Sequence, residues 1–304
     1  MSCTNPNYAL DLGMFDGKRK IKFLPKRYDL SSIHQLEARY GKEYILTLPC
    51  GQCTSCRLQY ARQWAVRCVL EASLHENNWF VTFTYRDSEL PYSKDDARRD
   101  VQLLFKRLRK LGYTFSYFGC CEKGETTKRF HHHILFFGLD LPDVRPLAKG
   151  QYGGYWYKSI VLEKAWNKGI VDLGDVEFGS ASYVARYSMK KQGKKDADEF
   201  IYMSTRPAIG KGWFDKHSDT IKQYDQIFCN FGKFNQASLP RYFDKLLELC
   251  DPDVFAQIKA KRLENSRIAQ LDDLIHNDLE YREEIYKMRD EQINKKVKRL
   301  KRGL

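Results

Sequence analysis

The stretch Arg129–Gly138, which reads RFHHHILFFG, decides how the middle of this chain folds. Its apolar run is short, contains aromatic and branched aliphatic side chains and ends at a glycine, so it predicts a buried β-strand. Because side chains alternate between the two faces of a strand, His131 and His133 point to one face and His132 to the other. Two imidazoles two residues apart on a rigid strand are well placed to bind one metal ion.

The segments around this strand predict an alternation of strands and helices. We expect strands at 79–85 and 113–121 with a helix at 94–111 between them, the histidine strand at 130–138, a helix at 160–167, a strand at 170–178 and a helix at 180–191, which Ser180 would cap. The order β-α-β-β-α-β is that of a ferredoxin-like unit, an antiparallel sheet with its helices on one face. The fold class is therefore α+β, with a helical, basic region predicted over residues 241–300.

A third candidate metal ligand, Glu122, follows the strand predicted at 113–121. In an antiparallel pair with the histidine strand, Glu122 would reach the face that carries His131 and His133. Imidazole and carboxylate ligands suit Mg²⁺ or Mn²⁺, and such an ion polarises the oxygens of a phosphate and neutralises charge in the transition state. The alternative is that the histidines are ordinary polar residues at the start of a strand, but three in succession favour the metal site.

Two tyrosines in the helix at 180–191 are candidate nucleophiles. Tyr183 and Tyr187 lie four residues apart and share one helix face, and Lys190, three residues beyond Tyr187, lies on the same face. A phenol has a pKa of about 10, so it becomes a nucleophile at neutral pH only with help from a metal ion or from nearby cations. The alternative is the ordinary apolar stripe of an amphipathic helix. The histidine strand favours the catalytic interpretation.

Four cysteines form a second candidate metal site. Cys50, Cys53 and Cys56 have the two-residue spacing of metal-binding turns, and Cys3 is the obvious fourth ligand of a tetrahedral structural zinc. The alternatives are reduced thiols that pack under the helix expected at 55–74, or an iron–sulfur cluster. The chain has nine cysteines and no recognisable export signal, so we expect a reducing cytoplasm, with free thiols or metal ligands rather than disulfides.

The composition is that of a soluble globular protein with a polyanionic partner. Lys and Arg number 52 against 39 Asp and Glu, which gives a net charge of +13, and 42% of the residues are hydrophobic. A charge excess of this size favours nucleic acid, although a basic surface alone can serve solubility. No apolar run is long enough to span a membrane. We expect three regions: a cysteine-rich segment with a basic helix at 1–76, a catalytic domain at 77–210 and a helical basic region at 211–304.

Together these motifs resemble one known family. Residues 49–57 (PCGQCTSCR), 80–85 (FVTFTY), 129–137 (RFHHHILFF) and 183–191 (YVARYSMKK) are similar, in this order, to the replication-initiation proteins of the Microviridae, most of all the gokushovirus type. Those proteins are rolling-circle initiators of the His-hydrophobic-His endonuclease superfamily. The resemblance covers about residues 44–210. It departs from the family at His132, where a hydrophobic residue is usual, and at Phe130, where a proline is common; neither departure removes a proposed ligand.

The resemblance implies a metal-dependent, site-specific enzyme that nicks and rejoins DNA. One tyrosine would attack a DNA phosphate, form a 5′-phosphotyrosine link and free a 3′-OH that primes synthesis, and the second would take over the strand at the end of a round. His131, His133 and Glu122 would hold the Mg²⁺ or Mn²⁺ ion. Related enzymes of the same superfamily, a relaxase or a transposase, are alternatives. A rival of another class is a non-catalytic, zinc-containing protein that binds single-stranded nucleic acid.

The implied partners are phage DNA, as origin, single strand and nicked duplex, and host proteins in the bacterial cytoplasm. No nucleotide-binding loop of the G-x-x-x-x-G-K-[ST] type occurs in the sequence, so a host helicase would unwind the duplex. A host polymerase and a host single-strand-binding protein would complete the machinery. We expect no membrane partner. Covalent attachment of the protein to DNA would separate the enzyme from the rival binding protein.

Overall fold

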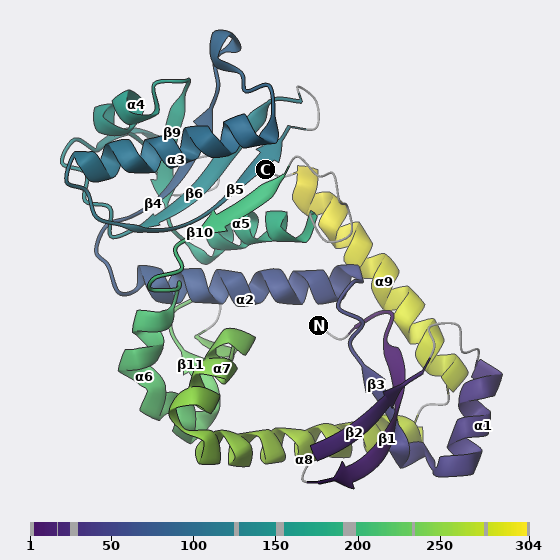
Figure 1. Cartoon of the computed structure of the whole chain (residues 1–304). Helices are drawn as coiled ribbons and strands as arrows, with labels where there is room; N and C mark the ends of the chain where they lie inside the picture. Colours follow the sequence, from purple (N-terminus) through teal and green to yellow (C-terminus); the bar gives the residue numbers. More distant parts are fainter. Residues whose placement is uncertain are drawn as a thin grey trace. The chain divides into compact units, whose positions relative to one another are not determined.

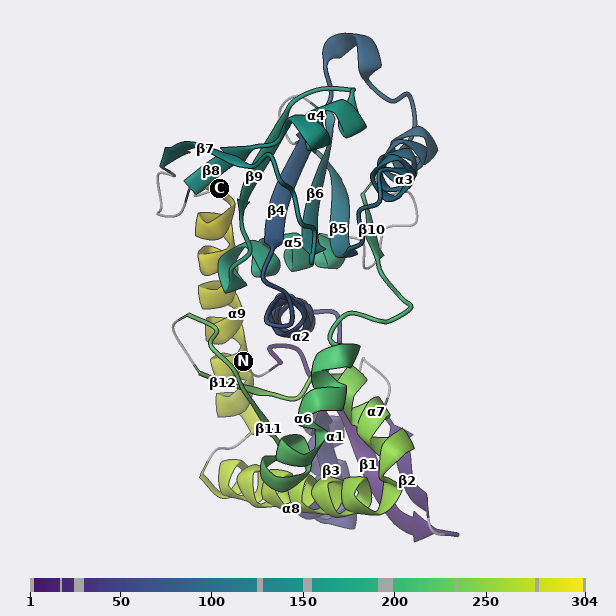
Figure 2. The same cartoon turned by 90° about the vertical axis from the view of Figure 1, so that its left-hand side faces the viewer.

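The computed structural model describes residues 3–16, 18–24, 30–124, 128–149, 155–190, 199–232, 235–276 and 279–302 of the chain. The contacts divide the chain into two compact units, one formed by Tyr60–Phe255 and the other by Met1–Gln59 together with Ala256–Leu304. Both units combine helices with antiparallel strands, as Figures 1 and 2 show. The predicted α+β class is therefore confirmed.

A seven-stranded sheet organises the larger unit. Its strands follow the order β10-β5-β6-β4-β9-β8-β7, and all neighbouring strands run antiparallel. The bounds are β4 Asn78–Thr84, β5 Ser116–Lys123, β6 Phe130–Phe137, β7 Arg145–Lys149, β8 Tyr155–Lys158, β9 Val171–Asp175 and β10 Phe200–Met203. The four strands predicted from the sequence are consecutive in this sheet. Strand β10 and the β7–β8 hairpin extend it beyond the ferredoxin-like unit of the prediction.

Helices cover both faces of this sheet, whereas the sequence predicted helices on one face. The helices α3 (Lys94–Lys110) and α4 (Ile160–Trp166) pack on one face. The other face is covered by α5 (Phe178–Lys190) and by the part of α2 (Thr54–Ala72) that belongs to this unit. Figure 1 shows α3 lying across the strands of the sheet.

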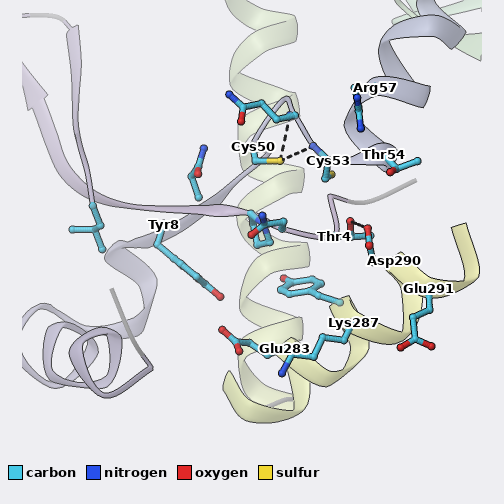
Figure 3. A pocket seen from close by; sticks show the side chains of 16 residues that line it. Thr4, Tyr8, Cys50, Cys53, Thr54, Arg57, Glu283, Lys287, Asp290 and Glu291 are labelled. Carbon is cyan, nitrogen blue, oxygen red and sulfur yellow. Dashed lines mark hydrogen bonds between the residues drawn. The ribbon is translucent and has the colours of Figure 1, made fainter. Parts of the chain in front are cut away.

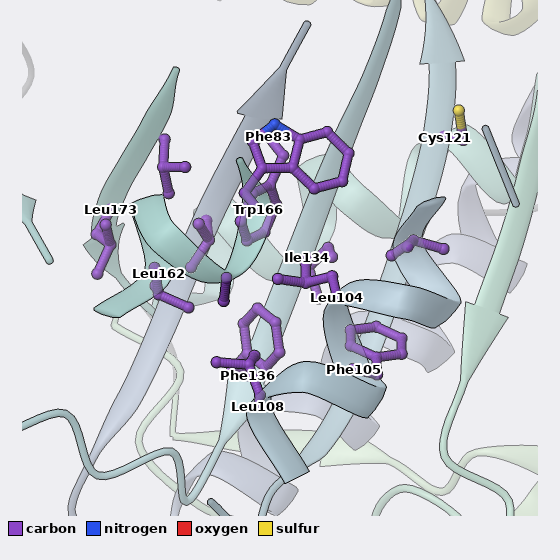
Figure 4. Packing of buried hydrophobic residues seen from close by; sticks show 14 of the residues in the cluster. Phe83, Leu104, Phe105, Leu108, Cys121, Ile134, Phe136, Leu162, Trp166 and Leu173 are labelled. Carbon is purple, nitrogen blue, oxygen red and sulfur yellow. The ribbon is translucent and has the colours of Figure 1, made fainter. Parts of the chain in front are cut away.

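The strand β6 explains this arrangement because it is apolar on both faces. Ile134 and Phe136 join the core beneath α3 and α4, which also contains Trp166 (Figure 4). Leu135 and Phe137 join the core beneath α5 and α2. All four β6 residues are fully buried. A strand that is buried on both faces needs a layer of helices on each side.

Helix α5 begins earlier than the sequence predicted. Its first residue is Phe178, and the hydroxyl of Ser180 accepts a hydrogen bond from the backbone N–H of Glu177 at 2.8 Å. Ser180 therefore lies inside the first turn and satisfies a backbone donor from there, rather than preceding the helix as its N-cap. Gly179 obscures this start in the sequence, because glycine weakens a helical pattern.

A three-stranded sheet in the order β2-β1-β3 lies in the smaller unit. The elements here are β1 Asn7–Phe15, β2 Lys18–Phe23, α1 Leu30–Tyr40, the 3₁₀ helix η1 Lys42–Tyr44 and β3 Ile45–Leu48. Leu10, Ile33 and Ile45 form the buried core. The sequence indicated an irregular segment at 1–43. Gly13, with a φ of 82°, lies where the β1–β2 register shifts, and this irregularity breaks the alternation that marks a strand.

Helices form most of the remaining described chain. They are η2 Asp87–Glu89, α6 Lys211–Tyr224, α7 Arg241–Cys250, α8 Pro252–His276 and α9 Leu279–Arg302, and the short hairpin of β11 Gln226–Phe228 and β12 Gln236–Ser238 follows α6. The helical pattern predicted over 241–300 is confirmed. Helix α6 was not predicted, because Gly210 and Gly212 at its start weaken the helical pattern. No described helix is both long and apolar enough to cross a membrane.

Candidate functional site

The register of three strands places the predicted metal ligands of the histidine strand on one face. His131 of β6 pairs with Glu122 of β5, and His133 pairs with Cys120 of β5 and with Thr82 of β4. Residues directly opposite in neighbouring strands share a face. Cys120 belongs to the core beneath α5, so His131, His133 and Glu122 all lie on the face that α5 covers.

His133 is held at both of its ring nitrogens. Its Nδ1 lies 3.0 Å from the hydroxyl of Thr82, and its Nε2 lies 3.1 Å from Oε1 of Glu122. The ring also stacks on Phe80, and only 7% of the residue is exposed. Contacts at both nitrogens fix the orientation of an imidazole, so Nε2 stays directed toward the carboxylate of Glu122.

Two tyrosines of α5 extend this contact. The hydroxyl of Tyr183 lies 3.4 Å from Nε2 of His133, and the hydroxyl of Tyr187 donates to that of Tyr183 at 3.0 Å. Their spacing of four residues brings the two rings into edge contact, with centroids 5.1 Å apart. Glu122, His133, Tyr183 and Tyr187 thus form one connected set, which we call the tyrosine line.

Both phenols of the tyrosine line are uncharged in this environment. Burial raises the pKa of Tyr183, and the negative charge of Glu122 raises it further. Burial also raises the pKa of Tyr187, together with hydrogen bonds to Glu122 and to Tyr183. Attack on a phosphate needs the phenolate, so this site requires a cation or a proton acceptor close to the hydroxyl that reacts.

His131 shares the face of His133 but not the tyrosine line. Burial and the neighbouring charge of His133 lower the pKa of His131, and its Nδ1 is buried without a hydrogen-bond partner. A neutral imidazole with a spare nitrogen is the form that binds metal ions. Two imidazoles and the carboxylate of Glu122 are a donor set that fits Mg²⁺ or Mn²⁺. Within the described residues these three ligands converge less closely than the four cysteines, whose sulfur atoms all lie within 4.8 Å of one another.

His132 points to the opposite face and is fully buried there. Its Nε2 lies 3.0 Å from the hydroxyl of Tyr85, and its Nδ1 lies 3.1 Å from the hydroxyl of Tyr202. Burial lowers the pKa of His132 to about 3, so the ring is neutral at physiological pH. Because both nitrogens have partners inside the core, His132 packs in the place where the resembling family usually carries a hydrophobic residue.

The remaining predicted catalytic residue, Lys190, ends α5, and its side chain lies outside the described residues. Arg186 brings a positive charge to the site, with its guanidinium carbon 5.9 Å from the ring centroid of Tyr183. Thr82 is a site residue that the sequence reasoning missed. Its position on a strand with polar residues at alternate places was a signal, but its contact with His133 depends on the pairing of β4 with β6.

The four cysteines come together in the smaller unit. Cys3 precedes β1, Cys50 and Cys53 lie in the turn between β3 and α2, and Cys56 lies in the first turn of α2. The Sγ atom of Cys3 is 3.6 Å from that of Cys50 and 3.7 Å from that of Cys53. Gly51, with a φ of 73°, makes the tight turn that brings two of the ligands together. We call this group, which can hold a metal ion, the cysteine cluster.

Backbone amides favour thiolates in the cysteine cluster. The amide of Cys50 donates to Sγ of Cys3 at 3.3 Å, and that of Cys53 donates to Sγ of Cys50 at 3.2 Å. Burial raises the pKa of Cys3. At Cys53 burial acts in the same direction, but hydrogen bonds from Cys56 and Thr4 outweigh it and lower the pKa to about 6. Four thiolates at this spacing repel one another, so full ionisation requires a bound cation.

One family model and three viral proteins are similar to this chain. The model, which describes replication-associated proteins of the ORF2 type, matches residues 78–192, which include the histidine strand and both tyrosines. The replication-associated protein ORF2 of Spiroplasma virus 4 is 30% identical over 283 residues, 86% of each chain. The replication-associated protein VP4 of Bdellovibrio phage phiMH2K is 32% identical over 240 residues, 73% of this chain and 75% of its own. The replication-associated protein ORF4 of Chlamydia phage 1 is 27% identical over 236 residues, 72% of this chain and 57% of its own.

No solved structure is significantly similar to the chain. The matched region, with its antiparallel sheet, histidine pair and tyrosine pair, places the chain among the replication-associated proteins. More narrowly, the chain belongs to the ORF2 family of these proteins and is a microvirus protein of the rolling-circle initiator type. The resemblance predicted from the sequence motifs is therefore confirmed.

Proposed function

We propose that this protein nicks and rejoins DNA at a specific site and thereby initiates rolling-circle replication of a small circular single-stranded-DNA phage genome. Membership of the ORF2 family of replication-associated proteins supports a role in replication initiation. The single observation that carries the chemistry is the tyrosine line, in which two hydroxyl nucleophiles lie beside a histidine and a carboxylate. An ordinary apolar stripe of a helix has no need of such polar partners.

The proposed reaction is a transesterification at a DNA phosphate. The oxygen of one tyrosine forms a bond to phosphorus, and the bond between phosphorus and the 3′ oxygen breaks. The products are a 5′-phosphotyrosine and a free 3′-OH, which takes up a proton from the solvent. The phenolic proton is released to Glu122, the carboxylate of the tyrosine line. One ester bond replaces another, so the same step run backwards rejoins the strand.

The histidine strand has a metal-binding role in this proposal. His131, His133 and Glu122 are the residues that would hold Mg²⁺ or Mn²⁺, and the bound ion supplies charge neutralisation at the phosphate oxygens. His133 is kept in orientation by Thr82, and the pKa of His131 is lowered, which keeps its imidazole neutral and available. Phage DNA is the proposed substrate, and host helicase, polymerase and single-strand-binding protein are the proposed partners in the host bacterial cytoplasm.

Within this reaction we assign the first attack to Tyr183 and the later transfer to Tyr187. The Tyr183 oxygen is the one that lies beside Nε2 of His133, and it accepts the hydrogen bond that Tyr187 donates. An accepted hydrogen bond stabilises a phenolate. The contact between the two hydroxyls accordingly acts to lower the pKa of Tyr183 and to raise that of Tyr187.

For the cysteine cluster we propose a structural Zn²⁺, because four thiolates fill every position of a tetrahedral site and leave none for a substrate. This ion would stabilise the fold of the smaller unit without taking part in nicking. The division of the chain into regions at 1–76, 77–210 and 211–304 is proposed on the same functional grounds, with the tyrosine line inside the middle region.

An adduct assay tests the proposed function. The purified protein is incubated with Mg²⁺ or Mn²⁺ and circular single-stranded DNA that carries the candidate origin, and covalent complexes are separated on a denaturing gel. We expect an adduct from the wild type and from the matched control Tyr202→Phe, which loses a buried hydroxyl bonded to the non-catalytic His132. The double variant Tyr183→Phe with Tyr187→Phe should form none. DNA binding without any adduct from the wild type would overturn the proposal and favour the non-catalytic binding protein.

A further inference from the structure

Two threonines beside the cysteine cluster hold the C-terminal helix α9. The hydroxyl of Thr4 donates to Oδ1 of Asp290 at 2.6 Å, and the hydroxyl of Thr54 donates to Oδ1 of Asn294 at 2.9 Å. Asn294 also donates from Nδ2 to Oδ2 of Asp290 at 2.8 Å. All of these residues belong to the smaller unit, and Figure 3 shows Thr4 next to Asp290. One connected set of hydrogen bonds thus attaches α9 to the loops of the cysteine cluster.

Each of the two threonines directly follows a cysteine of the cluster. Thr4 follows Cys3, and Thr54 follows Cys53. Because neighbouring Cα atoms are about 3.8 Å apart, the position of each sulfur restricts the position of the next hydroxyl. Thr4 is buried, so a displaced Thr4 would leave a costly unpaired contact with Asp290. The sulfur atoms therefore determine whether the threonines reach α9.

The spacing of the sulfur atoms matches that of a tetrahedral metal centre. A Zn–S bond of about 2.3 Å places the ligands of a tetrahedral site about 3.8 Å from one another. The Sγ atom of Cys3 lies at 3.6 Å and 3.7 Å from those of Cys50 and Cys53. A disulfide would need a separation of about 2.05 Å, and all four cysteines are free thiols. The N-terminal segment and the turn after β3 are thus at the distance that a shared ion would set.

We propose that a metal ion bound by the cysteine cluster positions Thr4 and Thr54 to bind α9, so that attachment of this helix depends on the metal. This inference rests on the proposed structural zinc and is independent of the nicking chemistry. It concerns the most basic segment of the chain, because residues 295–302 (KKVKRLKR) begin directly after Asn294 and contain six Lys and Arg. The metal would therefore determine where a segment suited to phosphate contacts is held.

The first half of α9 has an attachment that does not involve the cysteine cluster. Arg282 lies 3.8 Å from Glu37 of α1, and both side chains are buried. Loss of the metal should therefore release α9 beyond Asp290 and leave the part around Arg282 attached. This difference provides an internal reference for the experiment.

Limited proteolysis of the full chain tests the inference. Metal content is measured by mass spectrometry, the zinc-loaded and chelated proteins are digested with trypsin, and the cleavage sites are mapped. We expect about one equivalent of zinc. Its removal should accelerate cleavage after Lys295 and Lys296 on the order of tenfold relative to cleavage after Arg282. An absence of bound metal in reducing buffer, or unchanged cleavage after its removal, would overturn the inference.

Threonine variants separate this effect from general unfolding. Thr4→Val and Thr54→Val keep all four cysteines, so both should retain the zinc and yet show the accelerated cleavage. Thr47→Val, on β3 of the same unit, is the matched control and should behave as the wild type. Full zinc occupancy with wild-type cleavage in both variants would sink the inference. Adduct formation by the same preparations reports on the nicking function separately.

Discussion

The two candidate metal sites of this molecule are assembled to different degrees. In the cysteine cluster all four sulfur atoms lie within 4.8 Å of one another, and the polypeptide supplies every ligand. On the histidine strand, Glu122 meets His133 at 3.1 Å, while His131 keeps a buried Nδ1 without a hydrogen-bond partner. Structural metal sites are closed by protein ligands, whereas catalytic sites keep positions open for water or substrate. The difference is the one expected between a site that stabilises a fold and a site that performs a reaction.

The local chemistry of the two sites differs in the same sense. Backbone amides surround the sulfurs of the cysteine cluster, and the neighbouring threonines bind another helix, so this site connects parts of the fold. At the histidine strand the neighbours are two tyrosine hydroxyls, which are reactive groups. Variants at the two sites should therefore fail in different ways.

The largest effect is expected from the open site. His131→Ala combined with His133→Ala should lower the nicking rate by about 10³-fold or more, because the charge that stabilises the transition state is lost. DNA affinity should change little, since phosphate contacts come from Lys and Arg. Nicking of an origin oligonucleotide and binding by fluorescence anisotropy check the two parts. A wild-type nicking rate in the double variant would remove the distinction between the sites.

The closed site should affect stability and leave the chemistry of folded molecules intact. Cys50→Ser combined with Cys53→Ser should lower the free energy of unfolding by about 3 kcal/mol or more, because the metal contributes directly to folding. Calorimetry with and without a chelator measures this loss. The nicking rate per folded molecule should stay within about threefold of the wild type. An unchanged Tm would mean that the cysteines are ordinary packed thiols.

A smaller effect is expected at His132, between the two functional faces of the sheet. Folding lowers its pKa from 6.5 to about 3, so between these pH values the unfolded chain binds a proton that the folded chain excludes. Stability should therefore be lost as the pH falls below about 6.5, by up to about 1.4 kcal/mol per pH unit, and be unaffected above it. Denaturant unfolding at pH 7 and pH 5 checks this. His132→Phe should lose less stability on acidification than the wild type, and equal losses would contradict the assignment.

The smallest effect should follow from Thr82→Val. This change removes the hydroxyl that lies 3.0 Å from Nδ1 of His133 and keeps the shape of the side chain. A lost hydrogen bond of this kind corresponds to about 1 kcal/mol, or roughly a fivefold lower nicking rate. Thr84→Val, on the same strand, is the control. If both variants nick equally well, Thr82 does not orient His133.

The parts of the catalytic site that the sequence predicted are those with local geometry. Alternation along one strand assigned His131 and His133 to one face, and helical spacing brought Tyr183 and Tyr187 together. Thr82 was missed because its contact depends on strand pairing, which joins residues 51 positions apart. Sequence patterns describe one element at a time, so contacts between elements escape them.

The same limit explains the errors in the fold. Burial of β6 on both faces depends on which helices return to the sheet, and the sequence around it shows only a continuous apolar run. The first strand was missed because the irregularity at Gly13 interrupts its alternation. The contact of Thr4 with Asp290, 286 positions along the chain, has no sequence signal at all.

The most direct measurement is the site at which DNA becomes attached. Arg186 separates the two tyrosines, so trypsin places Tyr183 in the peptide Gly169–Arg186 and Tyr187 in the next peptide. After a single turnover on an origin oligonucleotide, mass spectrometry of the digest should find the nucleotide on Gly169–Arg186. Nucleotide on the peptide that begins with Tyr187 would contradict the order of attack. Nucleotide on any other peptide, or on none, would contradict the claim that the tyrosine line nicks DNA.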